Sequence, residues 1–321
     1  MEYFFIVNPQ AGAHNVQKLW PDIETELDKQ HIAYRTLITE HDGHAVTLAR
    51  RALNLINAVS NPNAVIVATG GDGTLHETMV GCMRYYADHP QQPKIPIAFL
   101  PVGSGNDFAR ALKIPLHWES ALTQILSCHS ATIITIGRFI NHDNQTDGYF
   151  TNNFGIGLDA AVVHHANHSL LKDSATLGKF SYMAAVFNTL IHFKGFRLTV
   201  RVPDQQPATY QKAYLVTTTN LPYFGGGIKI APDASVLDDT LDLIVVEKPN
   251  IFQLILFIVM LFLKRHLHLR FVHHYTEKKL FLKTEDSRYG QTDGEELGNK
   301  TFDLEFGTAK YPFWIKCKRH P

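Results

Sequence analysis

The sequence is poor in cysteine and has no excess of charge of either sign. Its 321 residues include three cysteines, Cys82, Cys128 and Cys317, which lie far apart and form no CxxC pair. This argues against a disulfide framework or a zinc ribbon and is typical of a protein of the reducing cytoplasm. Thirty Lys and Arg residues balance 30 Asp and Glu residues, so the formal net charge is +0 and nucleic acid is not an expected partner.

The sequence also lacks a hydrophobic run long enough to cross a bilayer. Its most apolar segment, Ile251 to Leu263, would form a helix about 20 Å long, whereas the hydrocarbon core is about 30 Å thick. Two interpretations stay open. The segment is either a helix buried in its domain, or an interfacial element whose apolar side enters lipid while Lys264, Arg265 and Arg270 contact anionic headgroups.

The P-loop motif GxxxxGK[ST] is absent, but another glycine-rich loop is present. The apolar run from Ala64 leads straight into Gly70 to Thr74 (GGDGT), which predicts a buried strand followed by a loop. Three glycines in four positions let backbone N–H groups approach an oxyanion, and the residues from Leu75 predict a helix whose N-terminus favours negative charge. We interpret the loop as the phosphate-binding loop of a kinase.

Asp72 is an unusual residue for such a loop. A carboxylate repels phosphates unless it binds a cation or a ribose hydroxyl, or polarises a nearby donor. We expect Asp72 to lie near Mg²⁺ or the phosphates of the donor.

Strands and helices alternate through the first part of the chain. Strands are predicted at 3–7, 33–39, 64–69 and 95–100, with helices at 16–31, at 44–59 and from Thr74. This alternation predicts a mostly parallel sheet with ligands at the carboxyl ends of its strands. The loops Asn8–Gly12, Gly70–Thr74 and Gly103–Asp107 then share one edge and together predict a nucleotide site.

From about residue 132 the pattern changes to short β-type runs. These are at 132–139, 149–154, 196–202, 210–219, 241–246, 278–282 and 302–306. They predict a second domain rich in antiparallel strands. We therefore expect an α/β domain at 1–130 and a β-rich domain at 131–306.

Two carboxylates flank a glycine near the end of the chain, at Asp293 and Glu295. Such a turn is often an ordinary acidic surface turn, but it can also present a carboxylate to a cleft. Phosphoryl transfer to a hydroxyl needs a group that accepts the hydroxyl proton. We take Asp293 as the candidate base.

These motifs together resemble the diacylglycerol kinase catalytic-domain family, which includes bacterial soluble diacylglycerol kinases, related bacterial lipid kinases and sphingosine kinases. The resemblance rests on Asn8-Pro9-x-x-Gly12, the GGDGT loop, Gly103 to Arg110 (GSGNDFAR) and Asp293-Gly294-Glu295, in order over nearly the whole chain. It implies an α/β nucleotide domain, a C-terminal antiparallel β-sandwich, a cleft between them and ATP as donor. It also implies that the tail, about 307–321, returns to the first domain.

The resemblance further implies roles for individual residues. It places ATP contacts at Asn8, Pro9, Gln10, Ala11, Gly12, Thr39, Gly71, Asp72, Gly73, Thr74, Leu75, His76, Glu77 and Ser104, and the three loops add Gly70, Asn106 and Asp107 to the predicted nucleotide site. The catalytic carboxylates would be Asp293, Glu295 and Asp72. A structural Mg²⁺ would be held by an acidic loop containing Ser235, Asp238, Asp239 and Thr240, although this loop has Asp239-Thr240 where relatives usually have Asp-Gly.

From all of these features we expect an ATP- and Mg²⁺-dependent lipid kinase that converts diacylglycerol to phosphatidate in the cytoplasm, peripherally attached to a membrane. Its partners would be a lipid substrate at the membrane surface and, as an open question, a second copy of the chain in a homodimer. The alternatives are a kinase for a sphingoid base or a phosphatidylglycerol-like lipid, an NAD kinase, and a nucleotide-responsive lipid-binding protein without catalysis.

Overall fold

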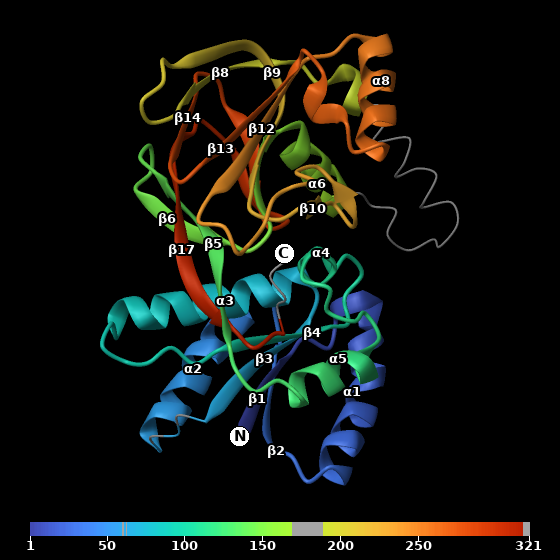
Figure 1. Ribbon diagram of the computed structural model, residues 1–321, viewed down its shortest axis with the longest axis vertical. Coiled ribbons are helices and arrows are strands. Elements are labelled where there is room, and N and C mark those ends of the chain that lie inside the picture. The colour runs from blue at the N-terminus through green and yellow to red at the C-terminus, as the bar shows by residue number, and fades with distance from the viewer. Residues whose placement is uncertain (60, 62, 169–188, 317–321) are drawn as a thin grey trace.

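The computed structural model describes residues 1–59, 61, 63–168 and 189–316, and its first half is an α/β domain (Figure 1). Its elements are β1 (Glu2–Val7), α1 (Ala11–Lys29), β2 (Ala33–Ile38), α2 (His44–Ala58), β3 (Ala64–Gly70), α3 (Asp72–Asp88), β4 (Ile97–Pro101), α4 (Asp107–Ala111) and α5 (Trp118–Leu126). The strands pair in parallel in the order β4-β3-β1-β2, which confirms the predicted parallel sheet. All seven residues of β3 are buried, because helices cover both faces of the sheet (Figure 1).

The second half is built from antiparallel strands, as predicted. Its described elements are β5 (Thr132–Asn141), β6 (Thr146–Phe150), β7 (Asn153–Gly157), α6 (Leu158–His168), β8 (Phe196–Arg201), β9 (Ala208–Thr219), β10 (Tyr223–Phe224), β11 (Ile228–Lys229), β12 (Leu241–Glu247), α8 (Ile251–Phe262), a 3₁₀ helix (His266–His268), β13 (Val272–Glu277), β14 (Leu280–Thr284), β15 (Arg288–Thr292), β16 (Glu295–Lys300) and β17 (Asp303–Phe313). The ring of Phe154 packs edge-on against Phe139, Phe302 and Phe306 in the core of this sandwich.

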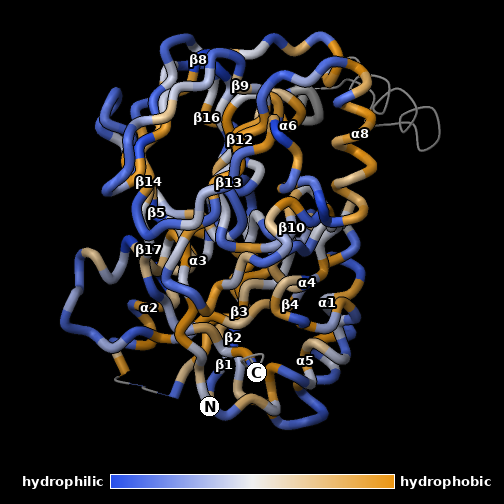
Figure 2. The backbone as a smooth tube through the Cα atoms, turned by 45° about the horizontal axis from the view of Figure 1, so that its top comes forward, coloured by the Kyte–Doolittle hydropathy of each residue, from blue (hydrophilic) through white to orange (hydrophobic). Residues whose placement is uncertain are grey.

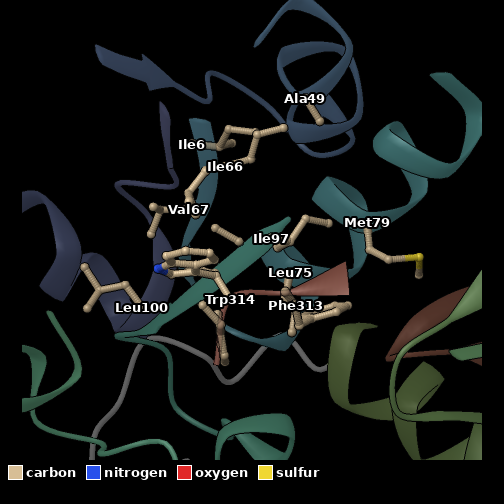
Figure 3. Packing of buried hydrophobic residues seen from close by; sticks show 14 of the residues in the cluster. Ile6, Ala49, Ile66, Val67, Leu75, Met79, Ile97, Leu100, Phe313 and Trp314 are labelled. Carbon is tan, nitrogen blue, oxygen red and sulfur yellow. The ribbon is translucent and has the colours of Figure 1, made fainter. Parts of the chain in front are cut away.

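Strand β17 connects the two halves. It pairs antiparallel with β5 over ten positions, from Leu304 to Phe313. Phe313 then pairs in parallel with Ile97 of β4, and the backbone N–H of Trp314 donates to the carbonyl of Ile97. Both aromatic side chains enter the core of the first half, beside Leu75 (Figure 3). The division of the chain near residue 130 stays our proposal.

Among the described residues, helix α8 packs along one side. Asn250 and Gln253 form a capping box at its start, and Leu254 and Phe257 are its buried residues. Phe252 and Phe262 are each 79% exposed. Figure 2 shows the helix as an apolar segment at the edge of the second half. Within the described residues, no helix is both long enough and apolar enough to cross a membrane.

Candidate active site

The three glycine-bearing loops meet at the carboxyl end of the parallel sheet, as the strand order predicts. The carbonyl of Gly70 accepts hydrogen bonds from the backbone N–H groups of Val102 and Gly103, at 2.9 and 3.0 Å. The Asn8 side chain donates to the Thr74 hydroxyl at 3.2 Å, which links the first loop to the second.

Glycine is required where these loops touch. A Cβ atom on Gly103 would lie 2.4 Å from the Cα of Gly71. A Cβ atom on Gly12, whose φ is +62°, would lie 2.5 Å from the carbonyl oxygen of Val102. The backbones can therefore pack together, and approach an oxyanion, only because no side chains intervene.

Asp72 connects the second and third loops. Its Oδ2 accepts a hydrogen bond from the backbone N–H of Asp107 at 3.0 Å, and its Oδ1 accepts one from Phe108 at 3.1 Å. These are the first N–H groups of α4, so Asp72 caps that helix. Burial raises the pKa of Asp72 despite these hydrogen bonds. Asp72 therefore orders the third loop, and its contact with Mg²⁺ or phosphates stays a prediction.

Seven of the residues predicted to contact ATP fall into two groups. One group lines a small hollow next to α2: Asn8, Gln10, Thr39, Thr74 and Glu77. In the other group, Leu75 is fully buried in the core and His76 faces Asp293. Glu77 also fixes the start of α2, because its carboxylate accepts hydrogen bonds from the backbone N–H groups of Gly43 and Ala45.

Asp293 lies at the centre of a buried set of donors. Its Oδ1 accepts hydrogen bonds from the backbone N–H groups of Asn152 and Asn153, at 2.8 and 2.9 Å. Its Oδ2 accepts the Thr151 N–H at 2.6 Å, the Thr151 hydroxyl at 2.8 Å and Nδ1 of His76 at 2.6 Å. Burial alone would raise the pKa of Asp293, but His76 and these donors outweigh it and the pKa lies below its usual value.

The same contacts explain a difference from the predicted strands. The sequence predicts one strand over 149–154, whereas β6 ends at Phe150 and β7 begins at Asn153. The N–H groups of Thr151 and Asn152 donate to Asp293 instead of to a neighbouring strand. The distant carboxylate of Asp293 thus interrupts the strand, and no short-range sequence pattern predicts this interruption.

Glu295 differs from Asp293 in its access to solvent. It lines a cavity of about 380 Å³ between α3 and the open end of the sandwich, and its side chain is 50% exposed. The cavity wall combines polar and apolar side chains: His76, Glu77, Arg84, Phe139, Phe154, Leu297, Lys300, Phe302 and Leu304 are among them. Burial raises the pKa of Glu295, and His76 opposes that increase.

Three buried oxygen atoms in or beside the third loop have no hydrogen-bond partner among the described residues. They are Oδ1 of Asn106, Oδ1 of Asp107 and Oδ1 of Asn152. The other carboxylate oxygen of Asp107 accepts the backbone N–H of Gly226 at 2.8 Å, from the turn between β10 and β11. Carboxylate and amide oxygens are the ligands that Mg²⁺ prefers, so these residues fit a cation bound together with a nucleotide.

Comparisons with known proteins find matches to both halves of the chain. A family model described as the diacylglycerol kinase catalytic domain matches residues 2–137, and one described as the YegS C-terminal NAD kinase beta sandwich-like domain matches residues 153–307. A diacylglycerol kinase of Staphylococcus haemolyticus is 31% identical over 249 residues, which are 78% of this chain and 68% of that protein. The chain belongs to the diacylglycerol kinase family. It is a phosphotransferase with an alcohol group as acceptor.

Two further proteins match nearly the full chain. The protein YtlR of Bacillus subtilis, named as a candidate lipid kinase, is 29% identical over 325 residues, which are 98% of this chain and 99% of that protein. A crystal structure of a candidate diacylglycerol kinase from Bacillus anthracis has a TM-score of 0.74 at 24% identity and covers 98% of this chain and 95% of that one. The likeness to the Bacillus anthracis structure shows that the two chains share the two-part fold.

In the acidic loop expected to hold a structural Mg²⁺, other side chains contact the Asp239 carboxylate, whereas Asp238 is exposed, and the metal site stays a prediction. Asp239 Oδ2 pairs with the Lys278 ammonium at 3.1 Å, while Oδ1 accepts the Thr308 hydroxyl at 3.0 Å and lies 3.7 Å from the Lys310 ammonium. Ser235 accepts a hydrogen bond from the backbone N–H of Leu237. Lysine side chains thus supply the positive charge beside this carboxylate. In the described part of the chain, no group of three or more His, Cys, Asp or Glu residues could hold a metal ion.

Sequence reasoning missed the donors around Asp293. Thr151, Asn152 and Asn153 precede Asp293 by 140 to 142 positions. Their one local signal is the polar stretch Thr151-Asn152-Asn153 between two apolar runs, which resembles an ordinary turn.

Proposed function

We propose that this kinase transfers the terminal phosphoryl group of ATP to the hydroxyl of diacylglycerol, giving phosphatidate. The observation that carries the proposal is the cavity beside Glu295. Its apolar wall, with Phe139, Phe154 and Leu297, suits acyl chains. His76, which also lines it, lies two residues beyond Thr74 of the glycine-rich loop, so a hydroxyl there would be close to the phosphates.

Glu295 is the proposed proton acceptor. As the lipid oxygen bonds to the γ-phosphorus and the bond to the β–γ bridging oxygen breaks, Glu295 takes the hydroxyl proton and ADP leaves. Asp293 is less suited to this step, because five donors occupy its oxygens and its side chain is fully buried. Its proposed part is to fix the β6–β7 turn and His76.

Backbone N–H groups of the glycine-bearing loops would bind the phosphates in this proposal. Mg²⁺, when bound with the nucleotide, supplies positive charge that offsets the charge of the phosphates. Asn106, Asp107 and Asn152 are the residues that would hold it, because each has one buried oxygen without a hydrogen-bond partner among the described residues.

A second acceptor class is supported by the basic residues of the cavity wall. Arg84 and Lys300 line the same space as Glu295. A lipid with an anionic headgroup, such as a phosphatidylglycerol-like lipid, would gain favourable electrostatic contacts there.

The acceptor can be identified by a labelling experiment. The purified protein is incubated with [γ-³²P]ATP and a membrane lipid extract, then with diacylglycerol, phosphatidylglycerol, a sphingoid base or NAD separately. We expect labelled phosphatidate, identified by mass spectrometry. Labelling of NAD alone would contradict the lipid proposal, and ATP binding without transfer to any lipid would favour a non-catalytic protein.

We also propose that α8 holds the enzyme on an anionic membrane surface. Seven exposed apolar residues lie in and just after this helix: Ile251, Phe252, Ile255, Leu256, Val259, Phe262 and Leu263. Exposed Lys264, Arg265 and Arg270 follow them. An apolar face next to a basic cluster is typical of helices that lie in the membrane interface.

Replacing Phe252 and Phe262 together by glutamate is expected to weaken vesicle binding at least about tenfold. Each phenylalanine that enters lipid contributes about 1.5 to 3 kcal/mol, and glutamate adds repulsion from anionic headgroups. Flotation with vesicles containing phosphatidylglycerol measures the bound fraction. Leu116→Glu, in the first half and 41% exposed, is the control and should float like wild type.

The dependence of vesicle binding on salt separates the electrostatic contribution of the basic cluster from the apolar contribution of α8. Wild-type binding should decrease with ionic strength, because the basic cluster acts through screened charges. If the Phe252 and Phe262 double variant floats as well as wild type, α8 does not contact the membrane.

A further inference from the structure

His76 joins the two halves of the active site, and the proposed reaction does not yet use it. The residue lies on α3 of the first half and is 5% exposed. Its Nδ1 is 2.6 Å from Oδ2 of Asp293, and its Nε2 is 3.8 Å from Oε2 of Glu295, both in the second half. A carboxylate only accepts hydrogen bonds, so Nδ1 of His76 carries a hydrogen atom and donates a hydrogen bond to Asp293.

The surroundings of His76 favour its positively charged form. The other four donors to Asp293 are uncharged, so His76 is the donor whose protonation would neutralise this buried carboxylate. Burial lowers the pKa of His76, but Asp293, Glu295 and Glu77 together outweigh it and raise the pKa above its ordinary value. Each of these three neighbours is acidic.

Glu295 in turn needs a positive neighbour. Burial raises its pKa, and the nearby carboxylates of Glu77, Asp293 and Asp42 raise it further. His76 is the group whose charge lowers it. Arg84, Asp147 and Lys300 also line the cavity.

We propose that His76 is a positioning residue whose imidazolium, fixed by Asp293, keeps Glu295 ionised and directed into the acceptor cavity. This inference rests on the proposed function, in which Glu295 accepts the hydroxyl proton. Asp293 acts through His76 and does not touch the acceptor.

The pH dependence of kcat/KM tests the proposal. Asparagine at position 76 can still donate a hydrogen bond to Asp293 but carries no charge. In His76→Asn the pKa of Glu295 should rise, so the acid limb of the profile should move up by about one pH unit, which is about a tenfold loss of rate on that limb. Activity should recover toward wild type at higher pH. A purely structural role would lower the rate equally at all pH values.

His164→Asn is the matched control. His164 pairs with Glu296, the residue next to Glu295, through Nδ1 at 2.7 Å. Removing it changes a histidine–carboxylate pair between α6 and β16, the strand of Glu295, and neither member of the pair lines the cavity. Its acid limb should coincide with that of wild type, and an equal shift in both variants would contradict a specific role for His76.

Nitrogen-15 spectra of the histidine side chains give a measurement that needs no His76 variant. The imidazole whose Nε2 signal shifts in Glu295→Gln should keep both ring protons to a higher pH than the exposed histidines do. If the imidazole that responds to Glu295→Gln loses its second proton at the same pH as the exposed histidines, the inference is wrong. If Glu295→Gln is fully active, the proposed function of Glu295 as proton acceptor is wrong. If Glu295→Gln is inactive but His76→Asn and His76→Gln leave the acid limb unchanged, only the proposed role of His76 is wrong.

Discussion

Replacing Glu295 by glutamine is expected to lower kcat by about 10²- to 10⁴-fold, which is the usual contribution of a general base. Glutamine keeps the shape of the side chain but cannot accept the acceptor hydroxyl proton. The side chain is 50% exposed, so the fold should be unaffected. Initial rates with ATP and diacylglycerol in mixed micelles measure the loss, and thermal unfolding with and without ATP checks that folding and nucleotide binding persist.

The neighbouring carboxylate provides a matched control for this experiment. Glu296 follows Glu295 directly in β16, and its carboxylate pairs with His164. Glu296→Gln therefore removes one negative charge from the same strand and should stay within about twofold of wild type. Equal activity of the Glu295 and Glu296 variants would show that proton acceptance resides elsewhere in the site.

The part of the site built by local chain geometry could be predicted. A glycine-rich loop after a buried strand, and loops at the carboxyl ends of neighbouring parallel strands, follow from short-range patterns and general topology. Asn8, Gly70 and Gly103 therefore come together as expected. The change from helix–strand alternation to short β-type runs likewise predicted the β-sandwich, because strand patterns need only a few residues to be visible.

The part built by distant contacts could not be predicted. His76 and Asp293 are 217 positions apart, and Thr151 and Asp293 are 142 apart. Residue types alone do not show whether the oxygens of a carboxylate already accept hydrogen bonds. From the sequence, Asp293 is therefore the candidate base in preference to Glu295. The structure distinguishes them by burial and by hydrogen bonds.

The sequence also could not predict which face of α8 is exposed. Its twelve residues are apolar except for Gln253, so the sequence contains no polar stripe that would mark the side turned to solvent. The position of the helix at the edge of the second half decides which side chains are exposed. For the acidic loop, the lysines that pair with Asp239 come from residues 278 and 310, well outside the local motif.

Replacing Gly103 by alanine is expected to have the largest effect on the nucleotide loops. The added Cβ would lie 2.4 Å from the Cα and 2.9 Å from the backbone nitrogen of Gly71, so no side-chain rotation can relieve the clash. The second and third loops must separate, which disturbs the hydrogen bond from the Gly103 N–H to the Gly70 carbonyl. Overpacking of this kind costs about 1 to 3 kcal/mol of stability, and a displacement of about 1 Å at a catalytic site can lower the rate about 100-fold.

Gly71→Ala probes the same contact from its other side. A Cβ on Gly71 would lie 3.5 Å from the Cα of Gly103, an ordinary van der Waals distance. Thermal unfolding of Gly71→Ala should therefore stay close to wild type, while that of Gly103→Ala should decrease by several degrees. The stabilisation produced by ATP should also disappear in Gly103→Ala, because the backbone N–H groups of two loops no longer converge on one phosphate group. If Gly103→Ala binds ATP and transfers phosphate as wild type does, the loops do not need their close contact, and the phosphates must be bound by other groups.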